Sequence, residues 1–270
     1  MTGDRTDPGS RVAVHQSGGS GVARVPYPIG VRRVAVAARR YLTPRMVRLT
    51  LAGPQLAGLH TYQCDDHVRI VFPDPDGTRR DPVPNDRDML DWPHPMPVTR
   101  KYTIRRFCPS KLELDLDVVL HEGGVASTWA AGCAAGDPVT VAGPPGAKVF
   151  PHAYEHYVFA VDATALPAVA RFLDEAPAGV SADVVVETGD GDLAAGYPLA
   201  RRERVAVRWL PRSPGDRSAL AAAVASLPLP SSRVFLFAAG ETGDIAPLRT
   251  SPLDKLVTGY WKRGVAEFDH

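Results

Sequence analysis

Apolar and polar residues alternate with a period of two along the first half of the chain. The alternation is clear in MVRLTL (46–51) and HVRIVF (67–72) and continues at 98–106, 112–120 and 137–142. Gly and Pro residues separate these segments, with little helical periodicity between them. Such alternation predicts half-buried strands, so this half of the chain is predicted to form a small antiparallel β-barrel that precedes a second domain.

The pattern changes after about residue 154. Short apolar segments now alternate with stretches of helical periodicity. The predicted strands lie at 156–161, 182–187, 204–210 and 233–238, and the predicted helices at 165–175 and 216–227. Strands that alternate with helices favour a parallel sheet, so the second domain is predicted to be an α/β domain.

Three segments depart from these patterns and set the domain limits. Residues 1–27 are small, polar and rich in Gly and Ser, which predicts a flexible leader. The barrel domain is then expected over 28–147 and the α/β domain over 148–270. Residues 73–97 are too rich in Pro and Asp for regular structure and are predicted to form a long loop on the barrel rim. A helix is expected just after Gly123-Gly124.

Composition narrows the function classes. The 270 residues carry 31 basic and 30 acidic side chains, a net charge of +1, which argues against a nucleic-acid-binding protein. Cys64, Cys108 and Cys133 are far apart, so neither a disulfide framework nor a zinc site is indicated, and no metal ligands are expected. Neither a secretory signal nor a membrane-spanning run is recognisable. We expect a cytoplasmic monomer.

The first chemical signal is the predicted strand RKYTIR (100–105). A flavin needs an aromatic plane, a small hydroxyl at its polar edge and a cation for its phosphates. Tyr102 would stack on the ring, Thr103 would bond to it and Arg100 would pair with the pyrophosphate, with Arg105 assisting. An amphipathic strand with exposed arginines is the alternative reading of this segment.

The second signal is HEGGVASTWA (121–130), about 20 residues later. Glycines before a helix let backbone amides approach a diphosphate, and the helix start adds a partial positive charge. Ser127 is predicted to donate to a phosphate oxygen or to cap the helix. There is no Walker A, G-x-G-x-x-G or G-x-S-x-G sequence, so kinase, standard Rossmann and hydrolase functions are not indicated.

These segments, taken with others further on, resemble the siderophore-interacting protein family, which are FAD-containing ferric-siderophore reductases related to ferredoxin reductases. The order of the segments is the same as in that family. They are RKYTIR, VVLHEGGVASTWA, GDPVTVAGPPG, DATALPA (162–168), WLPR (209–212), AGE (239–241) and GYWKRG (259–264). The resemblance extends from about residue 28 to the end.

The resemblance implies a bound FAD and an FAD-dependent oxidoreductase. Arg100, Tyr102 and Thr103 would contact the flavin side, and the turn from His121 through Gly123, Gly124 and Ala126 to Ser127 would contact the pyrophosphate. The remaining implied cofactor-binding residues, toward a nicotinamide nucleotide, are Asp162, Thr164, Glu241, Tyr260 and Trp261. Lys262, Arg263 and Arg249 would bind an anionic ferric siderophore. No acid–base catalytic residue is implied, because the reaction is electron transfer.

The same residues leave the donor and the substrate open. The family usually has a glycine where Val161 stands and an acidic residue where Ala163 stands, so the electrons are expected from NAD(P)H or, alternatively, from a ferredoxin. A flavoprotein of the same scaffold could instead act on an organic small molecule in biosynthesis, by redox or non-redox chemistry. A third alternative is a siderophore-binding protein without turnover.

Overall fold

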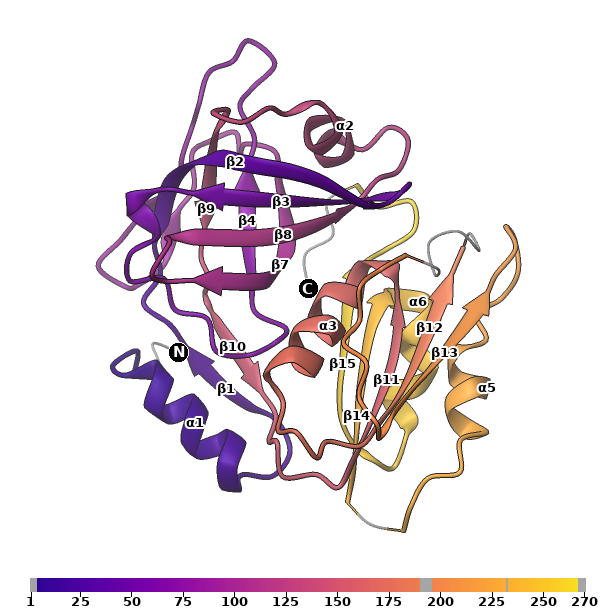
Figure 1. The fold of residues 1–270 in the computed structure, drawn as a ribbon. Coiled ribbons are helices and arrows are strands. Elements are labelled where there is room, and N and C mark those ends of the chain that lie inside the picture. Colours follow the sequence, from indigo (N-terminus) through magenta and orange to yellow (C-terminus); the bar gives the residue numbers. More distant parts are fainter. Residues whose placement is uncertain (1–3, 190–195, 232, 267–270) are drawn as a thin grey trace. The chain divides into compact units, whose positions relative to one another are not determined.

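The computed structural model describes residues 4–189, 196–231 and 233–266. The chain forms two compact units (Figure 1). The first contains residues 23–41 and 45–149 together with the N-terminal stretch up to Val14. The second contains residues 15–22, 42–44 and the chain from Phe150 onward. The main division therefore follows Val149, compared with the predicted limit at residue 147.

The first unit is a closed six-stranded barrel with the order β2-β3-β8-β7-β4-β9, which confirms the predicted antiparallel barrel. Its strands are β2 (Val31–Thr43), β3 (Met46–Ala52), β4 (His67–Val71), β7 (Thr99–Cys108), β8 (Glu113–Val119) and β9 (Pro138–Ala142). Alternate residues point inward, and Val47, Leu49, Ile70, Ile104 and Leu116 are among those that fill the core. Closure leaves this sheet without open edges.

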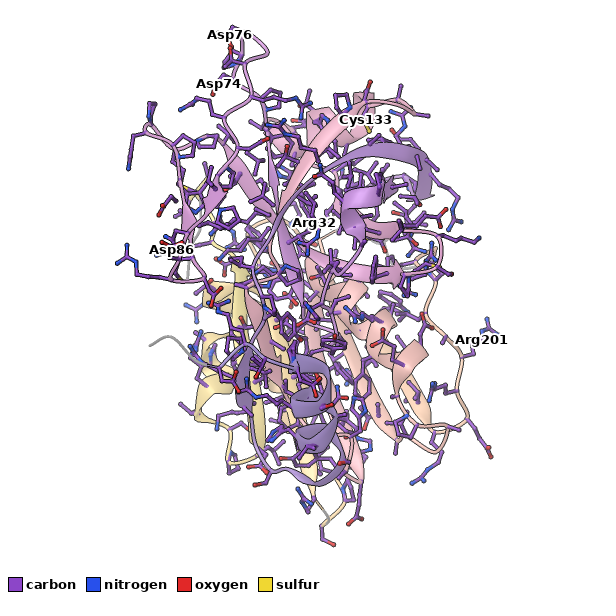
Figure 2. All side chains as sticks on the ribbon, turned by 90° about the vertical axis from the view of Figure 1, so that its left-hand side faces the viewer. Arg32, Asp74, Asp76, Asp86, Cys133 and Arg201 are labelled. Carbon is purple, nitrogen blue, oxygen red and sulfur yellow. The ribbon has the colours of Figure 1, made fainter. Side chains whose placement is uncertain are left out.

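One helix, α2 (Val125–Gly132), follows β8 and packs Ala126 and Ala130 into the same core. The predicted long loop contains two short paired strands, β5 (Val83–Pro84) and β6 (Leu90–Asp91), and η1 (Pro54–Leu56) lies earlier in the unit. Figure 2 shows Asp74 and Asp76 at the end of a projecting part of this loop, where Arg80 pairs with Asp74 at 2.5 Å.

The flexible leader predicted for residues 1–27 is corrected by the structure. Helix α1 (Pro8–Gly18) is followed by β1 (Ala23–Pro26), which pairs antiparallel with β10 (Gly146–Val149). Val12, Val25 and Tyr27 form a small buried cluster with Ala147 and Val149. The composition is polar overall, but these few apolar residues have a partner strand 120 residues away, which local composition does not reveal.

The second unit contains a five-stranded parallel sheet with the order β13-β12-β11-β14-β15, which confirms the predicted α/β domain. The strands are β11 (His156–Asp162), β12 (Ala182–Thr188), β13 (Val205–Pro211), β14 (Val234–Glu241) and β15 (Asp254–Trp261). The chain leaves β11 toward β12 on one side and returns to β14 on the other. The carboxyl ends of β11 and β14 therefore form the switch point where such sheets bind ligands.

Helices cover the two faces of this sheet, and the strand residues alternate between them. η2 (Ala163–Ala165) leads directly into α3 (Leu166–Glu175), whose Phe172 packs against Tyr157 and Phe159 of β11. Val158 and Ala160 instead pack with α5 (Leu220–Ala225), and Ile245 of α6 (Thr242–Ile245) and Leu248 of η3 (Ala246–Thr250) complete that cluster. The helix predicted over 216–227 is thus shorter than expected, and β15 lies in a segment for which no strand was predicted.

Candidate functional site

The residues predicted to contact a flavin lie on β7. In the barrel register Tyr102 is opposite Val68 and Thr103 is opposite His67 on β4. Strand alternation places Arg100 and Tyr102 on one face and Thr103 on the other. Tyr102 is half-buried against the barrel core, and burial raises the pKa of its phenol, opposed by the nearby charge of Arg100.

The neighbouring positions on β7 have distinct environments. Thr103 is buried. The guanidinium of Arg100 lies half-buried beside its own strand, donating to the Thr99 carbonyl at 2.7 Å. Arg105 lies at a bulge between Ile104 and Arg106, where the register with β8 shifts.

The predicted pyrophosphate turn connects β8 to α2. Gly123 has φ of +72°, a conformation that favours glycine, and Gly124 is the N-cap of α2. A Cβ on Gly124 would lie 2.4 Å from the His121 ring and 2.9 Å from Ser127 Oγ, so only glycine fits without rearrangement. No side chain caps α2, which leaves the first-turn amides of Val125 and Ala126 without a side-chain acceptor in the described structure.

Ser127 is not the cap of α2 as predicted, and its hydroxyl is hydrogen-bonded within the chain. Its buried hydroxyl donates to the Val119 carbonyl at 3.3 Å and accepts from the backbone N–H of His121 at 3.1 Å. It therefore ties the first turn of α2 to the end of β8, and the helix cap is Gly124. The exposed His121 ring donates from Nδ1 to the carbonyl of Glu122 at 3.1 Å, which also shapes the turn.

A hollow of about 430 Å³ opens beside the first turn of α2. Its lining residues are mostly apolar: Phe72, Pro73, Gly123, Val125, Thr128 and Trp129. Phe72 and Trp129 meet edge to face with their ring centroids 5.6 Å apart. An uncapped helix start, a glycine turn and an adjacent hollow with aromatic walls together fit the pyrophosphate and one flat end of a dinucleotide such as FAD.

The carboxyl edge of the parallel sheet is built around the carboxylate of Asp162. Oδ1 accepts from the N–H and hydroxyl of Thr164, at 2.8 and 2.5 Å. Oδ2 accepts from the N–H of Glu241 at 2.9 Å and from the indole Nε1 of Trp261 at 2.8 Å. Burial raises the pKa of Asp162, opposed by these hydrogen bonds. One carboxylate thus joins the ends of β11, β14 and β15.

Glu241 and Gly240 complete this arrangement. A Cβ on Gly240, whose φ is +150°, would lie 2.6 Å from Asp162 Oδ2. Glu241 Oε1 accepts from the N–H of Arg263 at 3.0 Å, and Oε2 accepts from the N–H of Asp244 at 2.9 Å. Burial alone would raise the pKa of Glu241, but the N–H groups of Arg263 and Asp244 are among the donors that lower it on balance.

Sequence reasoning gave no role to three residues at this edge. Arg212, directly after β13, pairs with Glu187 at 2.9 Å and with Asp244 at 2.5 Å. The available signal was their place in the sequence, because Glu187 ends a predicted strand and Arg212 and Asp244 follow predicted strands. Their pairing could not be predicted, because it requires three segments to meet. Arg263 also pairs with Asp244, so both carboxylates and both guanidinium groups of this ion-pair network are engaged within the chain.

The basic residues implied for substrate binding lie on two segments of the α/β unit, η3 and the residues after β15. Lys262 and Arg263 follow β15 and are exposed, and Arg263 lies 3.3 Å from Asp244. Arg249 is exposed on η3, between β14 and β15. Tyr260 is half-buried on β15, and the Trp261 side chain is 37% exposed.

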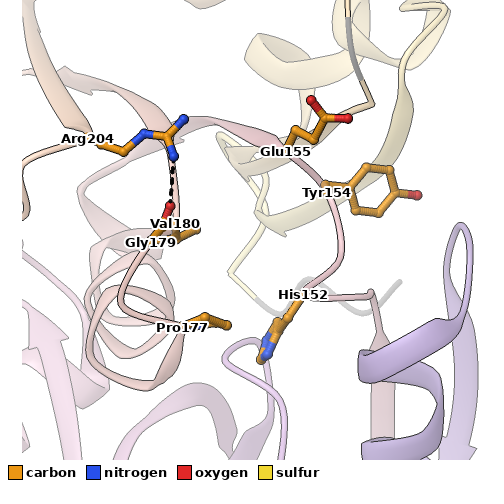
Figure 3. A pocket seen from close by; sticks show the side chains of 7 residues that line it. All are labelled: His152, Tyr154, Glu155, Pro177, Gly179, Val180 and Arg204. Atoms are coloured by element: carbon orange, nitrogen blue, oxygen red, sulfur yellow. Dashed lines mark hydrogen bonds between the residues drawn. The ribbon is translucent and has the colours of Figure 1, made fainter.

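A second hollow, of about 350 Å³, lies at the opposite edge of the sheet (Figure 3). Glu155, Val180 and Arg204 line it just before β11, β12 and β13 begin, and Arg204 donates to the Gly179 carbonyl at 3.3 Å. Burial lowers the pKa of His152 in its wall, which favours a neutral ring. Ligands of parallel α/β sheets bind at the carboxyl ends, so we assign this hollow no part in the site.

Among the residues that the structure describes, no group of three or more His, Cys, Asp or Glu side chains is arranged to hold a metal ion. No helix in the same residues has the length and apolar character needed to cross a membrane.

An antiparallel barrel with a glycine turn and an uncapped helix, followed by a five-stranded parallel α/β unit, defines the class: a two-domain flavoprotein oxidoreductase with the ferredoxin reductase fold. Family models match both parts, as a siderophore-interacting FAD-binding domain over residues 35–148 and as siderophore-interacting protein over residues 154–264. The chain belongs to the siderophore-interacting protein family, as the sequence motifs implied.

Individual relatives agree with this assignment. Ferric vibriobactin reductase ViuB of Vibrio cholerae is 29% identical over 242 residues, covering 85% of this chain and 88% of the relative. The NADPH-dependent ferric-chelate reductase of Escherichia coli is 30% identical, covering 81% and 85%. The crystal structure of a siderophore utilization protein from T. fusca superposes with a TM-score of 0.84 at 35% identity, covering 92% of this chain and 99% of that one.

Proposed function

We propose that this protein is an FAD-dependent reductase of ferric siderophores. One observation carries the proposal: the barrel unit matches the FAD-binding family model and also contains a glycine turn followed by α2, whose start no side chain caps. The names of the Vibrio and Escherichia relatives support reduction of a ferric chelate as the activity.

The barrel residues would hold FAD as follows. The Val125 and Ala126 amides and the positive end of α2 would bind the pyrophosphate, and Arg100 would add a cation. Tyr102 would present its ring to the flavin, and Thr103 its hydroxyl to a polar atom of the flavin edge. The hollow between Phe72 and Trp129 would exclude water from a flat aromatic end of the cofactor.

The chemistry needs no metal site of the protein, because the iron arrives in the siderophore. When bound, FAD supplies a carrier that takes up two electrons and can release them singly. Oxygen-rich chelators hold Fe(III) more tightly than Fe(II), so reduction weakens the complex and releases iron. The exposed Lys262 would attract the anionic chelate, whereas Arg263 already shares Asp244 and would contribute less.

The proposal is tested with FAD-loaded protein that has been reduced anaerobically by dithionite and freed of excess reductant. Ferric hydroxamate, catecholate and carboxylate siderophores are added separately with a ferrous trap. We expect stoichiometric Fe(II) from at least one class, and protein without FAD serves as the control. Absence of Fe(II) from all three classes, with FAD still bound, would contradict the proposal and favour an organic substrate or binding without turnover.

A further inference from the structure

Four carboxylates gather at the carboxyl edge of the parallel sheet, where a dinucleotide would bind. They are Asp162, Glu187, Glu241 and Asp244, and the cations hydrogen-bonded among them are Arg212 and Arg263. Glu187 is buried, and its Oε1 accepts from the Ala219 N–H at 2.7 Å and from the Ser218 hydroxyl at 3.1 Å. This part of the edge therefore carries excess negative charge.

Arg212 is the cation best placed to receive a phosphate, because it directly follows β13 and its side chain is largely buried. Every side-chain nitrogen is already engaged. Nη1 donates to Glu187 and Asp244, Nη2 to Asp244 at 3.3 Å and to the Asp216 carbonyl at 2.7 Å, and Nε to the same carbonyl at 2.9 Å. A guanidinium recognises phosphate through paired N–H donors, and here those donors already serve carboxylates and a carbonyl.

The helix start that would receive a diphosphate is occupied as well. Asp162 is the N-cap of η2, its Oδ1 accepts from the Thr164 N–H, and Pro167 brings no N–H to the first turn of α3. The positive end of this helix therefore already faces an anion belonging to the chain itself. This carboxylate opposes the diphosphate of NADH and of NADPH alike, so the two nucleotides can differ at this edge only through the 2′-phosphate.

We propose that the carboxylates of Glu187 and Asp244, by saturating Arg212, exclude the 2′-phosphate of NADPH from this protein. This inference rests on the proposed reductase function, and it names the class of electron donor that the function cannot use. The 2′-phosphate brings close to two negative charges and requires a cation with available donors. Neither NADH, which lacks that phosphate, nor a reduced ferredoxin has this requirement. The protein would differ here from its Escherichia relative, which is named as NADPH-dependent.

The test measures binding of NADP⁺ and NAD⁺ by calorimetry to FAD-loaded wild-type protein and to the variant carrying both Glu187→Gln and Asp244→Asn. The amides keep the size of the side chains while removing two charges from Arg212. The control is Asp183→Asn, which removes a carboxylate of the same strand β12 at its opposite end, where Asp183 contacts His156 at 2.9 Å. Flavin fluorescence and thermal unfolding report whether each variant is folded.

We expect wild-type protein to bind NADP⁺ at least about tenfold more weakly than NAD⁺, or not at all. The double variant should gain on the order of tenfold in NADP⁺ affinity, while Asp183→Asn should leave it unchanged. NADP⁺ binding to wild-type protein as tightly as NAD⁺ would overturn the proposal, as would a double variant that folds without gaining NADP⁺ affinity. Dithionite-driven Fe(II) release requires no nucleotide, so failure of the reductase function is observed separately.

Discussion

The starts of α2 and of the η2–α3 segment have the same local chemistry but differ in whether the chain itself fills them. We call the α2 start open, because no side chain caps it, and the η2 start occupied, because the Asp162 carboxylate caps it. Each follows a strand of its own unit and presents backbone N–H groups with partial positive charge. The α2 start has a glycine turn and no capping side chain, whereas Asp162 caps the η2 start with its own carboxylate. A helix start is therefore available to a phosphate only when the chain does not supply an anion of its own. In this protein the barrel unit meets that condition and the α/β unit does not.

The largest expected effect is on stability and comes from displacing the Asp162 carboxylate that caps the occupied η2 start. Gly240→Ala would place a Cβ 2.6 Å from Asp162 Oδ2 at a φ of +150°. The free energy of unfolding, measured by urea denaturation, should fall by about 3 kcal/mol. The control is Gly179→Ala, whose Cβ would meet open space, so a shift of less than about 0.5 kcal/mol is expected. Equal stability of the two variants would show that Asp162 does not bind tightly against β14.

The next largest effect is on FAD affinity and concerns Arg100, the cation proposed to act with the open α2 start. Arg100→Ala should raise the dissociation constant of FAD about 10- to 100-fold, because a charge-assisted contact to phosphate is lost. Quenching of flavin fluorescence measures this constant. Lys111→Ala removes a cation at the exposed β7–β8 turn of the same barrel, and it should leave FAD affinity unchanged. If the Arg100→Ala and Lys111→Ala variants bind FAD with equal affinity, Arg100 does not contact the pyrophosphate.

A carboxylate introduced at the open start should make it resemble the occupied one. Val125 is exposed on the first turn of α2 and lines the hollow. Val125→Glu should stabilise the protein without FAD by about 0.5 kcal/mol, since acids favour helix starts, yet weaken FAD binding about tenfold. Val125→Gln provides the neutral control. If Glu and Gln variants bind FAD equally, the pyrophosphate lies elsewhere.

The smallest effect is a pH dependence at the occupied edge. The pKa of Glu241 lies below its ordinary value of 4.5, so its ionised form stabilises the folded state. That contribution is complete above the unfolded-state pKa and is lost as the pH falls through the lower folded-state value. The difference in unfolding free energy between wild type and Glu241→Gln should therefore be largest near neutral pH. A difference that grows on acidification would contradict this direction.

Several features of the fold and the site could be predicted from local sequence because their causes are local. The alternation around Tyr102 predicted a barrel strand, and the Gly123-Gly124 pair predicted the turn before α2. The ordered N-terminal stretch could not be predicted in this way, because Val25 acquires its buried surroundings from β10, which is distant in sequence. Ser127 likewise is a residue type that often caps helices, but its hydroxyl instead forms hydrogen bonds with the backbone at and just after the end of β8.

The sequence by itself determined the two-domain architecture and the family, and it supplied the candidate flavin-binding residues, since periodicity and ordered motifs are properties of the chain read locally. Only the tertiary structure decided which cationic side chains are already paired with carboxylates of the chain and which could bind a ligand. Arg212, Glu187 and Asp244 come from three different segments, and charge neutralisation acts through distances of a few ångströms that the parallel sheet creates at its carboxyl edge.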